Sequence, residues 1–174
     1  MKDSRTPRAP QANLLPTLFE RLKDDHPGNT LESPESWTVN AAKMRDLVRD
    51  NLIDILNVVN LDHKDEIDLT RYPHVADSVL NFGIPPVAGR YLSEVRWDEI
   101  EKNIRKAVLR FEPRIIPDSL SVVPPVDIGK QRTGNTLRFL IQGMIHMDPH
   151  PLEFVMQSYL DLETSTFGED RPKD

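Results

Sequence analysis

The chain has 174 residues, 38% of them hydrophobic, and a formal net charge of −6. This length suits one domain with a real core, and the acidic balance argues against a nucleic-acid binder, which needs a basic face. The lack of cysteine excludes a disulfide framework and a thiolate metal site. No apolar run approaches the roughly 18 residues of a membrane span, and no apolar signal-peptide segment opens the chain. We therefore expect a soluble, cytoplasmic protein.

The N-terminal third begins with a polar, proline-containing segment at residues 1–13, which predicts a flexible arm. Leucine and phenylalanine then recur at helical spacing, so residues 14–24 are expected to form a short helix with Pro16 in its first turn. Turn formers and acidic residues over 25–36 predict a loop.

The first long helix is predicted over residues 38–59, where apolar residues recur every three or four positions and form one stripe that ends at Val59. Thr38 is the expected N-cap. The acidic residues that follow, 60–71, predict a loop.

Two further helices are predicted before the middle of the chain ends. Residues 73–82 form the first, with Pro73 in its first turn and Gly83 as its C-terminal cap. Residues 94–111 form the second, with a cap at Ser93 and a hydrophobic staple between Leu92 and Trp97. Because of that position, we expect Trp97 to belong to the core.

The apolar period changes to two after Pro117, which predicts strands. A short strand is expected at 119–123, and two longer alternating strands at 136–147 and 152–163. The Asp-Pro-His-Pro turn at 148–151 joins the two long strands as a hairpin.

Helices followed by strands predict an α+β fold, with N-terminal helices packed on a small, mainly antiparallel C-terminal β-sheet. We expect one domain over residues 14–164 and a flexible tail over 165–174. Such a small sheet has an open edge, and Leu140 and Met144 make its second face unusually apolar. Either a partner strand pairs with this sheet or a helix of the same chain covers that face.

The segment Phe-Glu-Pro-Arg at the end of the third helix is an electrostatic oddity. Glu112 lies at the negative end of the helix dipole, a misfit of roughly 0.3–1 kcal/mol, and Pro113 pushes it out of the helical conformation. A carboxylate in this place needs a partner, and Arg114 is the nearest cation. The pair could hold the fold together, bind another protein or carry out chemistry.

Two groups of residues could in principle bind a metal or carry out catalysis. His146, Asp148 and His150 could face one side and bind a metal, but a proline-rich turn usually carries such residues exposed to solvent. Glu112 with Asp118 or Glu101 could form a glycosidase pair. Arg114 would keep Glu112 charged, however, which does not suit a general acid. We expect neither a metal site nor a catalytic residue.

Four segments together resemble one known family. They are 14–22 (LLPTLFERL), 69–83 (LTRYPHVADSVLNFG), 110–114 (RFEPR) and 161–164 (DLET). Over about residues 14–164 the chain resembles TssE, the type VI secretion baseplate subunit that is similar to the wedge protein of contractile phage tails. The loop at 60–68 and the connection at 124–135 depart from this resemblance.

The resemblance implies a structural role without enzymatic activity, cofactor, small-molecule substrate or membrane insertion. Subunits of this kind join TssF and TssG, near TssK, in a cytoplasmic baseplate wedge that docks at the inner-membrane complex. They offer strands to the first ring of the TssB–TssC sheath, so that sheath growth starts on the baseplate.

The family's motif for contact with the wedge core falls on Glu112, Pro113 and Arg114 in this chain. For the sheath we expect contact through alternate residues of the last predicted strand, namely Val155, Gln157, Tyr159 and Asp161.

Two other functions remain open at this stage. The same fold family includes anti-adaptor proteins that bind a response regulator, so the chain could be a binding module of that type. The family is also labelled lysozyme-like, which suggests a peptidoglycan hydrolase, although the residues above form no convincing acid–base pair.

Overall fold

The computed structural model describes residues 39–63, 67–86, 96–124, 132–133 and 136–170, together with Leu22 and Gly28. The predicted arm and the loop at 25–36 lie outside these residues apart from Gly28. The predicted cap at Ser93, and with it the staple position of Trp97, is wrong, because the helix predicted over 94–111 begins at Trp97 with Arg96 as its N-cap. Of the helix predicted at 14–24, only Leu22 is described, in helical conformation.

Helix α2 (Ala41–Asn57) is the first long helix, and its predicted apolar stripe is buried along most of its length. Asn40, rather than the predicted Thr38, is its N-cap, since its side chain accepts the N–H of Lys43 at 2.8 Å. The prediction that this apolar stripe continues to Val59 is wrong, because Val59 lies beyond the helix and is 50% exposed. The chain leaves the helix there to pair with Ile84, whose N–H donates to the Val58 carbonyl at 3.0 Å.

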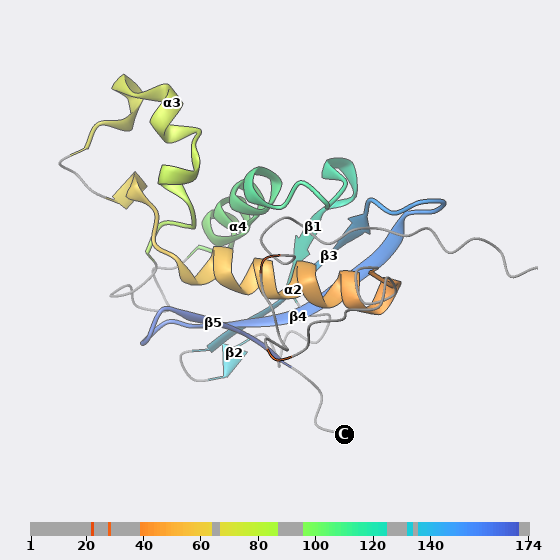
Figure 1. Cartoon of the computed structure of the whole chain (residues 1–174). Coiled ribbons are helices and arrows are strands. Elements are labelled where there is room, and N and C mark those ends of the chain that lie inside the picture. The colour runs from red at the N-terminus through yellow and green to blue at the C-terminus, as the bar shows by residue number, and fades with distance from the viewer. Residues whose placement is uncertain are drawn as a thin grey trace, which may run out of the picture.

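The helix predicted over 73–82 is broken in two, into α3 (Pro73–Ala76) and a 3₁₀ turn at Val79–Asn81. Ser78 causes the break: its hydroxyl donates to the Val75 carbonyl at 3.0 Å and accepts the N–H of Leu80 at 3.2 Å. Such side-chain bonds compete with a continuous helix. Two more 3₁₀ turns, Leu61–His63 and Leu69–Arg71, occupy part of the predicted loop. Figure 1 shows α3 standing away from α2, α4 and the sheet.

Helix α4 (Trp97–Phe111) begins after Arg96 and buries one face, formed by Ile100, Ile104, Ala107 and Val108. Trp97 packs against the core, with its ring centroid 6.1 Å from that of Phe139. The prediction that Trp97 is a core residue is therefore confirmed. None of the helices among the described residues is both long and apolar enough to span a bilayer.

The C-terminal half forms one antiparallel sheet, as predicted. Its strands are β1 (Ser121–Val123), β2 (Arg132–Thr133), β3 (Thr136–Ile145), β4 (Leu152–Asp161) and β5 (Thr166–Glu169), in the order β1-β3-β4-β5, with β2 also pairing with β3. The predicted hairpin joins β3 and β4 and closes on the pair Ile145 and Leu152. Helices followed by this open antiparallel sheet make the fold α+β, in agreement with the sequence.

The sheet alternates between a buried face and an outer face. Helices α2 and α4 lie on the same side of it (Figure 1), and their apolar faces join those of the strands in one core. Fully buried members of that core include Val48, Leu52, Ile104, Val108, Ile141 and Phe154. Among the described residues no helix packs on the other face, where Leu140 and Met144 are half-buried.

Strand β5 corrects the prediction of a flexible tail over 165–174. Its residues pair with β4, and Phe167 is buried among the core residues, with its ring 6.1 Å from Phe139. The strand has only four residues and contains Gly168, so its alternation was too short to be recognised. Gly168 leaves room for the Tyr159 ring, since a Cβ there would meet the ring at 2.4 Å.

Asn57 at the end of α2 closes the outer edge of β5. Its amide accepts the N–H of Phe167 at 2.9 Å and donates to the Phe167 carbonyl at 3.0 Å. A side chain thus takes the place of a further strand on this edge.

Replacing Asn57 with alanine should lower the free energy of unfolding by about 1–2 kcal/mol, because two hydrogen bonds to the strand are lost. The amide of Phe167 should exchange faster, with its free energy of opening lowered by a similar amount, which NMR would measure. Unchanged exchange at Phe167 would show that the amide does not hold this edge.

Candidate functional site

The Glu112 side chain is fully buried, although sequence alone placed it at a helix exit beside a proline. It is the C-cap of α4, and its own N–H donates to the Val108 carbonyl at 2.9 Å. Its exposed fraction is 0%. A carboxylate removed from water to this extent requires several hydrogen-bond donors.

Arg114 supplies most of those donors and forms a two-pronged ion pair with Glu112. Its Nε lies 2.7 Å from Oε1 and its Nη2 lies 2.8 Å from Oε2. The Arg114 backbone N–H also donates to Oε1 at 3.2 Å, and Asn51 of α2 donates from Nδ2 to Oε2 at 2.8 Å. The predicted partner of Glu112 is therefore confirmed, and the geometry is the fork that arginine offers to carboxylates.

The residues after Pro113 join helix α4 to the sheet. The Arg114 carbonyl accepts the N–H of His146 at 2.8 Å, and Ile116 donates its N–H to the Met144 carbonyl at 2.8 Å. Glu112, Asn51 and the end of β3 thus meet at one junction between α2, α4 and the sheet. Pro113 is exposed at its surface, whereas the Arg114 side chain is only 18% exposed.

Asn51 is the member of this junction that the sequence analysis missed. It occurs three residues after Val48 and four before Ile55, both buried, so it lies near the apolar stripe of α2. A polar residue at such a position is the signal that could have identified it, because buried amides need partners.

The junction offers no arrangement for acid–base chemistry. Glu112 has no exposure to solvent, and its carboxylate already accepts two charge-assisted and two amide hydrogen bonds. Asp118 is exposed on a 3₁₀ turn at Pro117–Ser119. Among the described residues, no three His, Asp or Glu side chains lie close enough together to hold a metal ion. His146, Asp148 and His150 therefore do not form such a group.

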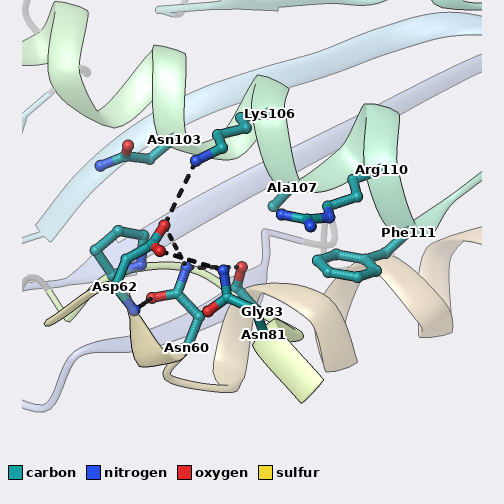
Figure 2. Close-up of a pocket in the computed structure, with 10 residues that line it drawn as sticks. Asn60, Asp62, Asn81, Gly83, Asn103, Lys106, Ala107, Arg110 and Phe111 are labelled. Atoms are coloured by element: carbon teal, nitrogen blue, oxygen red, sulfur yellow. Dashed lines mark hydrogen bonds and ion pairs between the residues drawn. The ribbon is translucent and has the colours of Figure 1, made fainter. Parts of the chain in front are cut away.

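A small pocket lies between α4 and the two segments around Asn60 and Gly83, which pair with each other after the end of α2. Figure 2 shows Asn60, Asp62 and Asn81 grouped beside Gly83, with Lys106 reaching them from α4. The pocket holds about 20 Å³, room for about one water molecule and no substrate. Its polar groups largely bind one another, which indicates a structural role.

The four strand residues expected to contact a sheath lie on β4, on the outer face of the sheet. Met156 and Leu160 between them are buried against the helices, so the alternation is as predicted. Strand β4 lies between β3 and β5, however, and its residues from 158 to 161 are paired on both sides. The backbone there is not free to accept a further strand.

Comparison with known families bears on the whole arrangement. The family model described as "Baseplate wedge protein gp25" matches residues 42–150, more than half of the chain. The chain belongs to the baseplate wedge protein gp25 family. No curated protein and no solved structure matches it.

The gp25 match includes the Glu112–Arg114 junction, both long helices and β3. The two strands β4 and β5 follow the matched residues. The family is one of structural components of phage-tail-like baseplates, so the resemblance noted from the four sequence segments is confirmed at the level of the wedge family.

Proposed function

We propose that this gp25-family chain is a non-enzymatic subunit of a type VI secretion baseplate wedge. In this role it binds TssF and TssG, near TssK, in a cytoplasmic baseplate docked at the inner-membrane complex, and helps to start the TssB–TssC sheath. The observation that carries the proposal is the gp25 match over residues 42–150, together with the TssE-like sequence segments. Co-purification with TssF and TssG tests it.

The burial of Glu112 supports the absence of enzymatic activity. A general acid must exchange a proton with substrate or water, and this carboxylate reaches neither. The one small pocket described above has no room for a sugar ring. A turbidity assay on cell walls should show no lysis by the purified chain.

The junction supports a docking role that depends on its internal ion pair. Glu112 and Asn51 fix the direction of Arg114, while Pro113 and the exposed part of the Arg114 side chain remain at the surface. Preorganisation of this kind lowers the entropy lost on binding. In this proposal the ion pair shapes the loop and the exposed part of the loop contacts the wedge core.

Strand addition by the sheath is supported at a single position among the four expected residues. In an antiparallel strand, residues two apart direct their backbone groups to the same side. The Glu153 carbonyl accepts Arg45 Nε at 2.9 Å, and the Gln157 carbonyl accepts the N–H of Asp170 at 2.9 Å, both on the side away from β3.

Val155, between these two residues, therefore directs its N–H and carbonyl to the same outer edge. Among the described residues neither group has a recorded partner, and the Val155 side chain is 47% exposed. We propose that a sheath strand pairs with β4 here, beyond the end of β5, and that Gln157, Tyr159 and Asp161 contribute side chains only.

Replacing Val155 with proline should reduce sheath initiation about tenfold while the domain stays folded. Proline removes only the outward N–H, because the alternation set by Gln157 directs the Val155 backbone groups away from Gln142, its partner on β3. One lost backbone hydrogen bond, worth about 0.5–1.5 kcal/mol, corresponds to at most roughly this factor. Sheath formation on purified baseplates would measure it by electron microscopy.

The matched control is Val155→Thr, which keeps the backbone N–H and the branched shape and should initiate sheaths normally. If a folded Val155→Pro protein starts sheaths as well as the unmodified chain does, strand addition at this edge is wrong.

A further inference from the structure

Exposed apolar side chains concentrate in one part of the described chain. Of nine large hydrophobic residues recorded as exposed, six fall between residues 58 and 80. Two adjacent ones are the most exposed of these, Val79 at 77% and Leu80 at 69%. We call this pair the apolar knob. Adjacent exposed apolar side chains are candidates for contact with a partner, whereas singly scattered ones are ordinary.

The apolar knob lies on the segment that stands away from the rest of the fold (Figure 1). It forms the start of the 3₁₀ turn Val79–Asn81, and α3 packs on that turn and on the turn at Leu69–Arg71. Neither α3 nor the Leu69–Arg71 turn contains a buried residue. The fold therefore holds these two aliphatic side chains in water instead of using them in its core.

The base of the segment is held rigidly by Asn81, which follows the knob directly and is 1% exposed. Its Oδ1 accepts the N–H of Leu61 at 2.8 Å, while its Nδ2 donates to Asp62 at 3.2 Å and to the Ala76 carbonyl at 3.1 Å. One side chain thus joins the beginning of the segment to its end (Figure 2).

Side chains of helix α4 also hold the same segment in place. Lys106 Nζ lies 3.4 Å from Asp62, and Arg110 Nη2 lies 3.0 Å from Asp77 and also binds the Ala76 carbonyl. Polar ties to α4 and a buried amide at the base set the direction of the knob. A backbone segment that is already held in place loses little entropy when it is bound.

We propose that the apolar knob inserts into an apolar pocket on a neighbouring protein subunit of the wedge, an inference that rests on the proposed function. No charged residue occurs between Asp77 and Phe82 in the sequence, so an apolar pocket suits the knob itself better than a charged site does. A standard interface buries about 800 Å² on each partner, far more than two aliphatic side chains supply. The knob therefore suits one contact within a larger assembly and not a dimer of this chain.

The test replaces both knob residues, Val79→Ser with Leu80→Ser, and measures affinity for the purified TssF–TssG complex. Burial of two aliphatic side chains is worth enough for a loss of affinity of about tenfold to a hundredfold. Because both side chains are mostly exposed, the melting temperature should match that of the unmodified chain. The matched control is Leu109→Ser on α4, a residue 38% exposed, which should bind normally.

Equal affinity of the double variant and the unmodified chain would overturn the inference while leaving the proposed function intact. Failure of the unmodified chain to bind TssF–TssG would contradict the proposed function itself. A photo-reactive residue at position 80 gives an independent measurement: cross-links to TssF or TssG are expected, and cross-links only between copies of this chain would overturn the inference.

Discussion

Replacing Arg114 with alanine is expected to lower the free energy of unfolding by about 3 kcal/mol or more. The change leaves the Glu112 carboxylate, which is 0% exposed, without its two charge-assisted donors. Removing one partner of a buried ion pair typically costs about 3–5 kcal/mol. For a chain of this length the melting temperature should fall by roughly 6–12 °C, and denaturant unfolding would give the free energy directly.

Arg71→Ala is the matched control for this prediction. Arg71 also pairs with a carboxylate close in sequence, Asp68, but the two side chains are 78% and 53% exposed. Exposed pairs of this kind contribute about 0–1 kcal/mol. Equal destabilisation by Arg114→Ala and Arg71→Ala would show that the junction does not depend on its ion pair.

A docking role for Arg114 has to be tested in a variant that keeps the domain stable. Because Arg114 is buried against Glu112, Arg114→Ala is expected to lower stability as well as any binding by the arginine. The double variant Glu112→Gln with Arg114→Met removes both charges and should recover much of the stability. If that folded variant still fails to bind TssF–TssG, the arginine contacts the partner; normal binding would restrict the motif to a structural role.

Replacing Gly83 with alanine should be the most damaging change outside the junction, at about 3 kcal/mol or more. Gly83 has a φ of 102°, and a Cβ there would lie 2.0 Å from the Val58 carbonyl oxygen. Backbone atoms cannot move aside as a flexible side chain can, so the pairing of Val58 with Ile84 must open. Strain of about 1–3 kcal/mol adds to the lost backbone hydrogen bonds.

Gly28→Ala is the control, because nothing lies within 4 Å of a Cβ at that position. Its effect should stay within about 0.5 kcal/mol. Amide exchange should also show faster opening of residues 58–84 in the Gly83 variant. If both alanine variants are equally stable, the close approach of Gly83 to Val58 does not exist in solution.

The long periodic elements could be predicted from sequence because one pattern determines each of them. The stripe of α2 and the alternation of β3 and β4 repeat over ten or more residues, and each buries the face it predicts. The breaks were less visible. Ser78 ends a helix through two local hydrogen bonds, and β5 is too short to show a period. Both depend on contacts that only the folded chain supplies.

Only part of the junction could be predicted from the sequence. A glutamate at a helix exit two residues before an arginine predicted their pairing, and the structure confirms it. Burial of that pair could not be predicted, since it depends on Asn51 of α2 and on the backbone of β3, about 60 and 30 residues away. The exposure of Val79 and Leu80 could not be predicted either, because their sequence pattern predicted one continuous helix over both residues.

Co-expression of this chain with TssF and TssG, followed by size-exclusion chromatography with light scattering, tests the central claim most directly. A wedge subunit should elute with TssF and TssG as one complex of fixed stoichiometry. Elution of the folded chain alone, at its own mass of 20.0 kDa, beside an intact TssF–TssG complex would contradict the account.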